Sequence, residues 1–182
     1  MSVKINVWYP KGENVGHASI EFHGTYMSWW PSSENASKLK MVKMVFTGGP
    51  GAAPTYDDDK SSEGGEPSWT GDYFGWENDD KAIEYWKKIY FSDLQKGVSA
   101  MRAGNKDAQY SFVSNNCCDV VDQLLVQAGA YSWQVKLNLW RGMKIKLAPR
   151  DIATIGAYLG GQTSLLNTPK AWTPAPDIRK ES

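Results

Sequence analysis

Short runs of alternating apolar and polar residues dominate the start of the chain. The alternation predicts four strands, over residues 3–9, 15–22, 25–30 and 40–46. His23-Gly24 predicts a two-residue hairpin turn between the second and third strands, because glycine tolerates a positive φ. Pro31 is expected to end the third strand.

Helical spacing takes over in the second half. It predicts helices over about residues 80–90, 93–103, 117–128 and 149–159. The third of these follows Asn116 and ends at Gly129, a favourable C-terminal cap. Residues 133–147 mix apolar and basic side chains and predict one or two further strands. Because strands come early and helices late, we expect an α+β fold with an antiparallel sheet packed against helices.

One segment, residues 47–75, lacks any period and is rich in Gly, Pro, Asp and Ser. This composition predicts an insertion loop within a single domain that spans residues 1–168. The acidic run Asp57–Asp59 matches no calcium-loop spacing, so we expect a solvated acidic loop there. Residues 169–182 are expected to form a loosely ordered tail.

Composition narrows the functional classes. The chain has 182 residues, 41% of them hydrophobic and 22% charged, as is typical of a soluble globular protein. Its 20 basic and 20 acidic residues balance, so no basic excess points to nucleic acid or to an anionic membrane. No apolar run has the length of a signal-peptide core or a membrane span. We therefore expect a cytoplasmic location in the producer, or secretion without a cleaved signal peptide.

The two cysteines of the chain, Cys117 and Cys118, are adjacent and stand where a helix begins. A disulfide between neighbours is strained, so thiol chemistry or simple burial remains. The apolar face of the predicted helix consists of Val120, Val121, Leu124, Leu125 and Ala128. Cys117 falls within this face and Cys118 at its edge. The residues expected to point outward are Asp119, Asp122 and Gln123.

The position of Cys117 favours a reactive thiol. The first turn of a helix stabilises a thiolate through its N–H groups and its dipole. Asn115 and Asn116 precede it and provide amide groups where an oxyanion needs donors. His17 is the candidate base, because it lies inside a strand between small neighbours, whereas His23 is expected to be an exposed turn residue.

Hairpin pairing supplies a candidate partner for His17. It places Ser28 diagonally opposite His17 on the same face of the sheet. A serine hydroxyl is a weak orienting group. A backbone carbonyl or a carboxylate, such as Glu21 or a loop aspartate, would take this role if Ser28 did not.

The segments “GHASIEF…GTYMSWWP” and “YSFVSNNCCDVVDQLLVQAG” together resemble the circularly permuted papain-like cysteine hydrolases, in which the histidine strand precedes the cysteine helix. These include lecithin retinol acyltransferase-like enzymes and NlpC-type cell-wall peptidases. The resemblance implies the following catalytic residues: Cys117 as nucleophile, His17 as base and Ser28 as orienting group. Relatives carry a histidine or another strongly polar residue at the Ser28 position. The candidates for the substrate cleft are Trp29, Trp30 and Tyr110.

The implied activity is amide hydrolysis through a thioester acyl-enzyme, with no cofactor and no metal. A peptidase or amidase of this kind would act on cell-wall peptides or on a target protein. The size of the chain is similar to that of bacterial effector toxins, which implies a cognate inhibitor (immunity) protein as partner. Two alternatives stay open. One is a lipid acyl hydrolase or acyltransferase of the same fold, and the other is a non-enzymatic binding module in which Cys117 and His17 are structural.

Overall fold

The structure is a computed structural model, and it describes residues 2–12, 14–31, 51–91, 109–111, 115–131 and 148–160. Several predicted features lie outside the described residues. They are the strand over residues 40–46, the helix over residues 93–103, the strands within residues 133–147 and the tail at residues 169–182.

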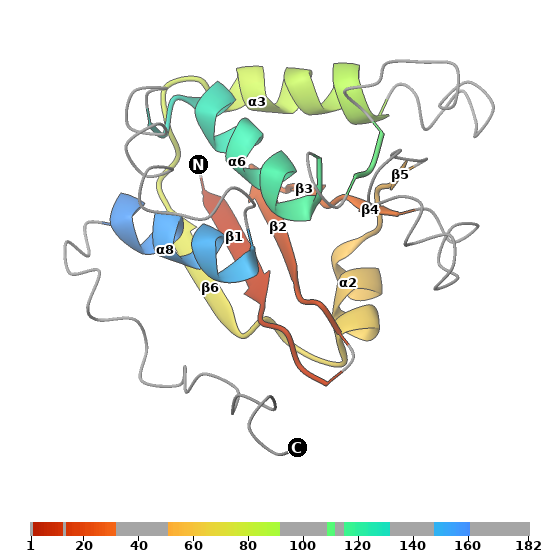
Figure 1. Cartoon of the computed structure of the whole chain (residues 1–182). Coiled ribbons are helices and arrows are strands. Elements are labelled where there is room, and N and C mark those ends of the chain that lie inside the picture. The colour runs from red at the N-terminus through yellow and green to blue at the C-terminus, as the bar shows by residue number, and fades with distance from the viewer. Residues whose placement is uncertain are drawn as a thin grey trace.

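An antiparallel sheet of four strands forms the centre of the described structure (Figure 1). In spatial order its strands are β3 (Thr25–Met27), β2 (His17–Phe22), β1 (Val3–Trp8) and β6 (Trp69–Tyr73). The predicted turn at His23-Gly24 joins β2 to β3, and its residues have the positive φ values, 50° and 79°, of a tight hairpin turn. The strands predicted over residues 3–9 and 15–22 are therefore confirmed as β1 and β2, although β2 starts at His17.

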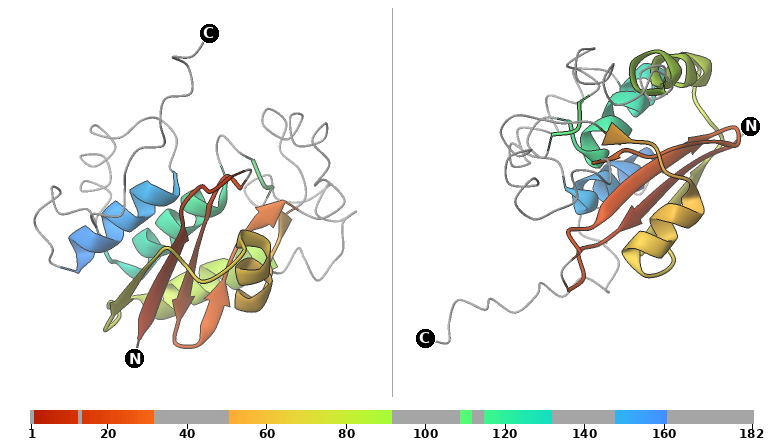
Figure 2. Two further views of the ribbon diagram at one scale, coloured as in Figure 1. Left: turned by 90° about the horizontal axis from the view of Figure 1, so that it is seen from below. Right: turned by 90° about the vertical axis from the view of Figure 1, so that its right-hand side faces the viewer.

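The helices lie on both sides of this sheet. The described helical segments are α2 (Tyr56–Glu63), α3 (Asp79–Trp86), the π-helical turn η2 (Lys87–Phe91), α6 (Cys117–Ala128) and α8 (Pro149–Leu159). α6 and α8 pack on one face of the sheet, α3 packs against α6, and α2 lies on the opposite face (Figure 2). The expected fold class, an α+β fold with an antiparallel sheet packed against helices, is confirmed.

The two faces of the sheet differ in character because side chains alternate along each strand. The face toward α6 and α8 is apolar and fully buried, with Val3, Ile5, Val7, Ala18, Ile20, Phe22 and Met27 all at most 1% exposed. The register pairs Trp8 with His17 and Asn6 with Ser19 on the other face. His17 therefore points away from the apolar core and toward the side that α2 covers.

The third predicted strand is wrong in its second half. Pairing with β2 ends at Met27, and β4 (Trp30–Pro31) pairs instead with β5 (Gly51–Ala52) in a separate two-stranded sheet. Trp29 leaves the ladder because its indole packs into the core, against Gly51, where no room remains for a side chain.

The prediction of an insertion loop over residues 47–75 is also wrong. Within the described part of this segment, β6 pairs with β1 along its length, and α2 forms a helix with both ends capped. Thr55 and Asp58 make a capping box at its start, and Gly64 ends it in the left-handed conformation. The acidic first turn also suits the positive end of the helix dipole. The Gly, Pro, Asp and Ser content of the segment predicted a loop, although these local capping residues favour a helix.

The remaining helices match the sequence closely. α6 and α8 have the predicted bounds, and the helix predicted over residues 80–90 is α3 followed by the π-helical turn. One residue of α6 departs from the predicted face. Asp122 was expected to point outward but is 1% exposed, because it accepts a hydrogen bond from the Tyr131 hydroxyl just beyond the end of the helix. In the described ranges, no helix combines the length and apolar character needed to cross a bilayer.

Packing between α8 and β6 makes a first prediction. Alanine in place of a helical glycine normally stabilises a helix by about 1 kcal/mol. At Gly156, however, the added methyl would meet the Trp69 ring, so Gly156→Ala should lower the free energy of unfolding by about 1–3 kcal/mol. Gly160→Ala is the control, because its neighbours leave ordinary van der Waals distance. Denaturant unfolding measures both, and a stabilised Gly156→Ala variant would show that β6 does not pack there.

Candidate active site

Cys117 and His17 meet where β2 begins. His17 is the first residue of β2, and Cys117 is the first residue of α6. The Cys117 sulfur lies close enough to the His17 ring for each group to shift the pKa of the other, and the Ala18 N–H also favours the anionic form of the sulfur. Cys117 is 8% exposed and His17 is 1% exposed. A molecule that arrives from solvent therefore meets Cys117 rather than the His17 ring. The pair predicted from the sequence is thus brought together.

The His17 ring is held from the side away from Cys117. Its Nε2 lies 2.8 Å from Ser28 Oγ and 3.0 Å from Asp59 Oδ2. Because both partners sit on Nε2, Nδ1 is the nitrogen left for the Cys117 thiol. Ser28 is therefore where the hairpin register placed it. A carboxylate from α2, that of Asp59, is the second partner of His17.

Asp59 is fully buried, which contradicts the expectation of a solvated acidic loop at Asp57–Asp59. One oxygen accepts from the Tyr26 hydroxyl at 2.6 Å and from His17, and the other accepts from Trp30 Nε1 at 2.7 Å. Burial acts to raise the pKa of Asp59, but the hydrogen bond and charge of His17 and the bonds from Tyr26 and Ser28 bring the pKa below its ordinary value. Asp59 therefore stays a carboxylate facing the ring.

Aromatic rings fix the plane of His17. The Trp30 indole stacks on it with centroids 4.6 Å apart, and the Trp8 ring lies 5.6 Å away. Of the three side chains proposed for a substrate cleft, Trp30 alone is partly exposed. Trp29 packs in the core against Trp86 and Tyr90, and Tyr110 is 4% exposed.

The side chains of the two asparagines before Cys117 make hydrogen bonds to neighbouring parts of the chain. Asn116 Oδ1 caps α6 by accepting from the N–H groups of Cys118 at 2.8 Å and Asp119 at 3.1 Å. Asn115 donates to the Gln109 carbonyl at 2.9 Å and accepts from the Tyr90 hydroxyl. Within the described part of the chain, the cap leaves the Cys117 N–H without an acceptor. This backbone N–H is a donor available to an oxyanion, whereas the cap occupies the Oδ1 atom of the Asn116 amide.

The charges of the pair reinforce each other. The hydrogen bond from Cys118, together with the charge and hydrogen bond of His17, lowers the pKa of the Cys117 thiol well below its ordinary value despite burial. Burial alone would lower the pKa of His17, but the Cys117 thiolate and Asp59 raise it to about 10. Both shifts favour a thiolate and an imidazolium over the neutral pair.

Glu63 is a second carboxylate near this pair. It follows Asp59 by four residues, which places both on one side of α2. Its side chain is half-buried, and burial, the Cys117 thiolate and Asp59 raise its pKa while the His17 charge opposes them. The sequence left a loop aspartate open as a partner of His17, and Asp59 holds that position, whereas nothing in the sequence pointed to Glu63. The capping signals around α2 could have revealed the helix.

No protein-family model, curated protein or solved structure matches this chain. Among the described residues, no group of three or more His, Cys, Asp or Glu side chains is placed to hold a metal ion.

Removing the Asp59 charge should loosen the ion pair. Asp59→Asn keeps the size of the side chain but leaves the imidazolium without its carboxylate, so the His17 pKa should fall by one unit or more, about 1.4 kcal/mol per unit. Asp57→Asn, an exposed change on the same helix, should leave that pKa unchanged. An NMR titration of the His17 imidazole signals measures this. An unaltered His17 titration in Asp59→Asn would separate Asp59 from the site.

Proposed function

We propose that the protein is a cysteine hydrolase with a permuted papain-like fold that cleaves an amide bond. The observation that carries the proposal is the arrangement of Cys117, His17 and Asp59. A thiol in the first turn of a helix faces a histidine whose other nitrogen is bound by a buried carboxylate. A nucleophile, a base and an orienting group in this order make the set needed for acyl transfer.

The fold supports the same proposal. The histidine strand precedes the cysteine helix in the chain, and the sheet is antiparallel with α6 packed on it. This is the order and packing that the resemblance to the permuted papain-like hydrolases implies. Asp59 supplies the charged partner that a serine at position 28 lacks, and Ser28 adds a second hydrogen bond to the same nitrogen.

The steps follow from the geometry. The Cys117 thiolate attacks the carbonyl carbon, and the Cys117 N–H donates to the oxyanion that forms. His17 gives its Nδ1 proton to the leaving amine, and a thioester acyl-enzyme remains. His17 then takes a proton from water as the water attacks the thioester, which releases the acid and restores the thiolate and the imidazolium. Throughout, Asp59 holds the ring and stabilises its charged form.

For the substrate, we propose a peptide, either of the cell wall or of a target protein. In the same proposal the protein is a bacterial effector toxin with a cognate immunity protein. This part rests on the resemblance.

Alkylation by iodoacetamide near pH 6 tests the ion pair directly. Because the thiolate persists at this pH, Cys117 should react fast, and His17→Gln should slow it at least tenfold by removing the cation beside the sulfur. Peptide mapping by mass spectrometry locates the label, and Cys117→Ala is the blank. Equal rates in wild type and His17→Gln would contradict the proposed pair.

Substitutions of His17 and of its two partners should reduce turnover by different amounts. With turnover measured as new amino groups released from a digest of bacterial cell wall or from an unfolded protein, His17→Ala should abolish activity. Asp59→Asn should lose on the order of a hundredfold or more, and Ser28→Ala about tenfold, because Ser28 carries no charge. Wild-type turnover by Asp59→Asn would remove Asp59 from the mechanism. Release of fatty acid from phospholipid vesicles without amine release would instead favour the lipid acyl hydrolase.

A further inference from the structure

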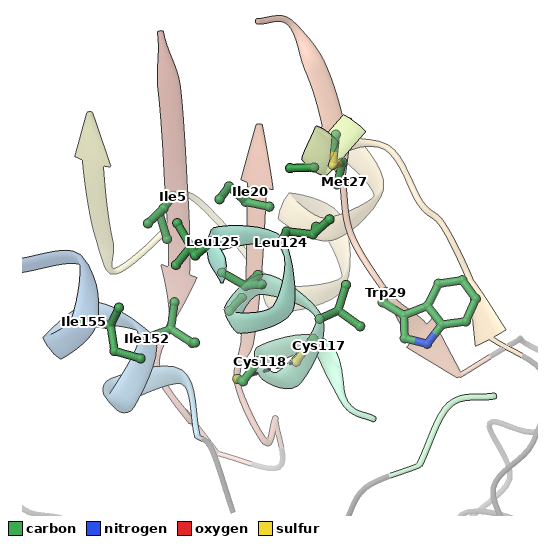
Figure 3. Close-up of a cluster of buried hydrophobic side chains, with 14 of the residues drawn as sticks. Ile5, Ile20, Met27, Trp29, Cys117, Cys118, Leu124, Leu125, Ile152 and Ile155 are labelled. Carbon is green, nitrogen blue, oxygen red and sulfur yellow. Dashed lines mark hydrogen bonds between the residues drawn. The ribbon is translucent and has the colours of Figure 1, made fainter. Parts of the chain in front are cut away.

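The second cysteine touches the nucleophile. Cys118 Sγ lies 3.8 Å from Cys117 Sγ, within the range of a hydrogen bond between sulfur atoms. Both residues are free thiols in the first turn of α6, where Figure 3 shows them side by side. Cys118 is 1% exposed. Their separation is far from the roughly 2.05 Å of a disulfide, so the contact is non-covalent.

The surroundings of the two sulfur atoms decide which of them donates. The Cys117 sulfur has the His17 ring and the Ala18 N–H directed at it, and both groups favour an anion. The charges that act on Cys118 are those of Asp119, of Asp151 in α8 and of the Cys117 thiolate, and all three are negative. Burial and these charges raise the pKa of Cys118 well above its ordinary value, so it stays protonated.

We propose that Cys118 is a positioning residue whose S–H donates a hydrogen bond to the Cys117 thiolate. The inference rests on the proposed function and extends it, because it assigns a task to the second thiol of the chain. A thiolate in a buried site must find donors or take back the proton from His17. Three groups favour negative charge on the Cys117 sulfur: Cys118, Ala18 and His17. Of these, Cys118 lies on the side of the apolar core. The bond weakens as the sulfur charge passes to the substrate.

The test is the pH dependence of iodoacetamide alkylation at Cys117 in the full chain. Cys118→Ala removes the donor, so the acid limb of the profile should move up by about one pH unit, a tenfold slower reaction below the midpoint. Cys118→Ser keeps a donor of similar size and should restore the wild-type limb. Val121→Ala, an equally buried truncation on α6, controls for lost packing and should leave the limb in place. Thermal unfolding followed in parallel confirms that each variant is folded.

The outcomes separate the two proposals. A wild-type limb in Cys118→Ala, or a shifted limb in Cys118→Ser, would overturn the role of Cys118 while Cys117 stays reactive. Alkylation of Cys118 itself on the acid limb would also overturn it, since a donor must be protonated. Slow alkylation of Cys117 near pH 6 in the wild type would overturn the proposed function as well.

Discussion

The burial of the His17–Asp59 pair is the constraint around which the rest of the site is built. Asp59 is fully buried and His17 nearly so, and removing two such charges from water costs several kcal/mol for each ion. The cost is offset only when each remaining lone pair has a donor. Tyr26, Trp30 and Ser28 supply those donors, which explains why one face of the sheet carries polar and aromatic residues beneath a helix.

The polar contacts continue from the site into the sheet. The Tyr26 hydroxyl lies 2.7 Å from Ser19 Oγ as well as 2.6 Å from Asp59, and Asn6 donates to Ser19 at 3.4 Å. Ser19 and Asn6 are almost completely buried. This chain of hydrogen bonds fixes the register of β1, β2 and β3 on the face away from the apolar core. The strands are therefore specified twice, by apolar packing on one side and by directional bonds on the other.

The sequence predicted those parts of the fold that depend on near neighbours. Alternation identified β1 and β2, and helical spacing with its caps identified α6 and α8. The hairpin turn fixed the register that brings Ser28 to His17. Asp59 could not be assigned in this way, because its contact with His17 joins residues 42 apart in the chain. Its helix, α2, buries no other residue, so no apolar period marks it. Asp122 was misjudged for a similar reason, since Tyr131 reaches back to it from beyond Gly129.

The contrast between the two sides of the sheet has a consequence for local unfolding. α6 and α8 are attached by a continuous apolar core. The attachment of α2 consists of the hydrogen bonds of Asp59, the 2.9 Å bond from Trp8 Nε1 to the Gly65 carbonyl and the ring contacts of Tyr56 with Trp8 and Tyr26. Such an element can open as a separate cooperative unit at a free energy below that of global unfolding. Its release would strip His17 of its carboxylate while the sheet and the cysteine helix stay folded. Loss of the site and loss of the fold are then two distinct transitions.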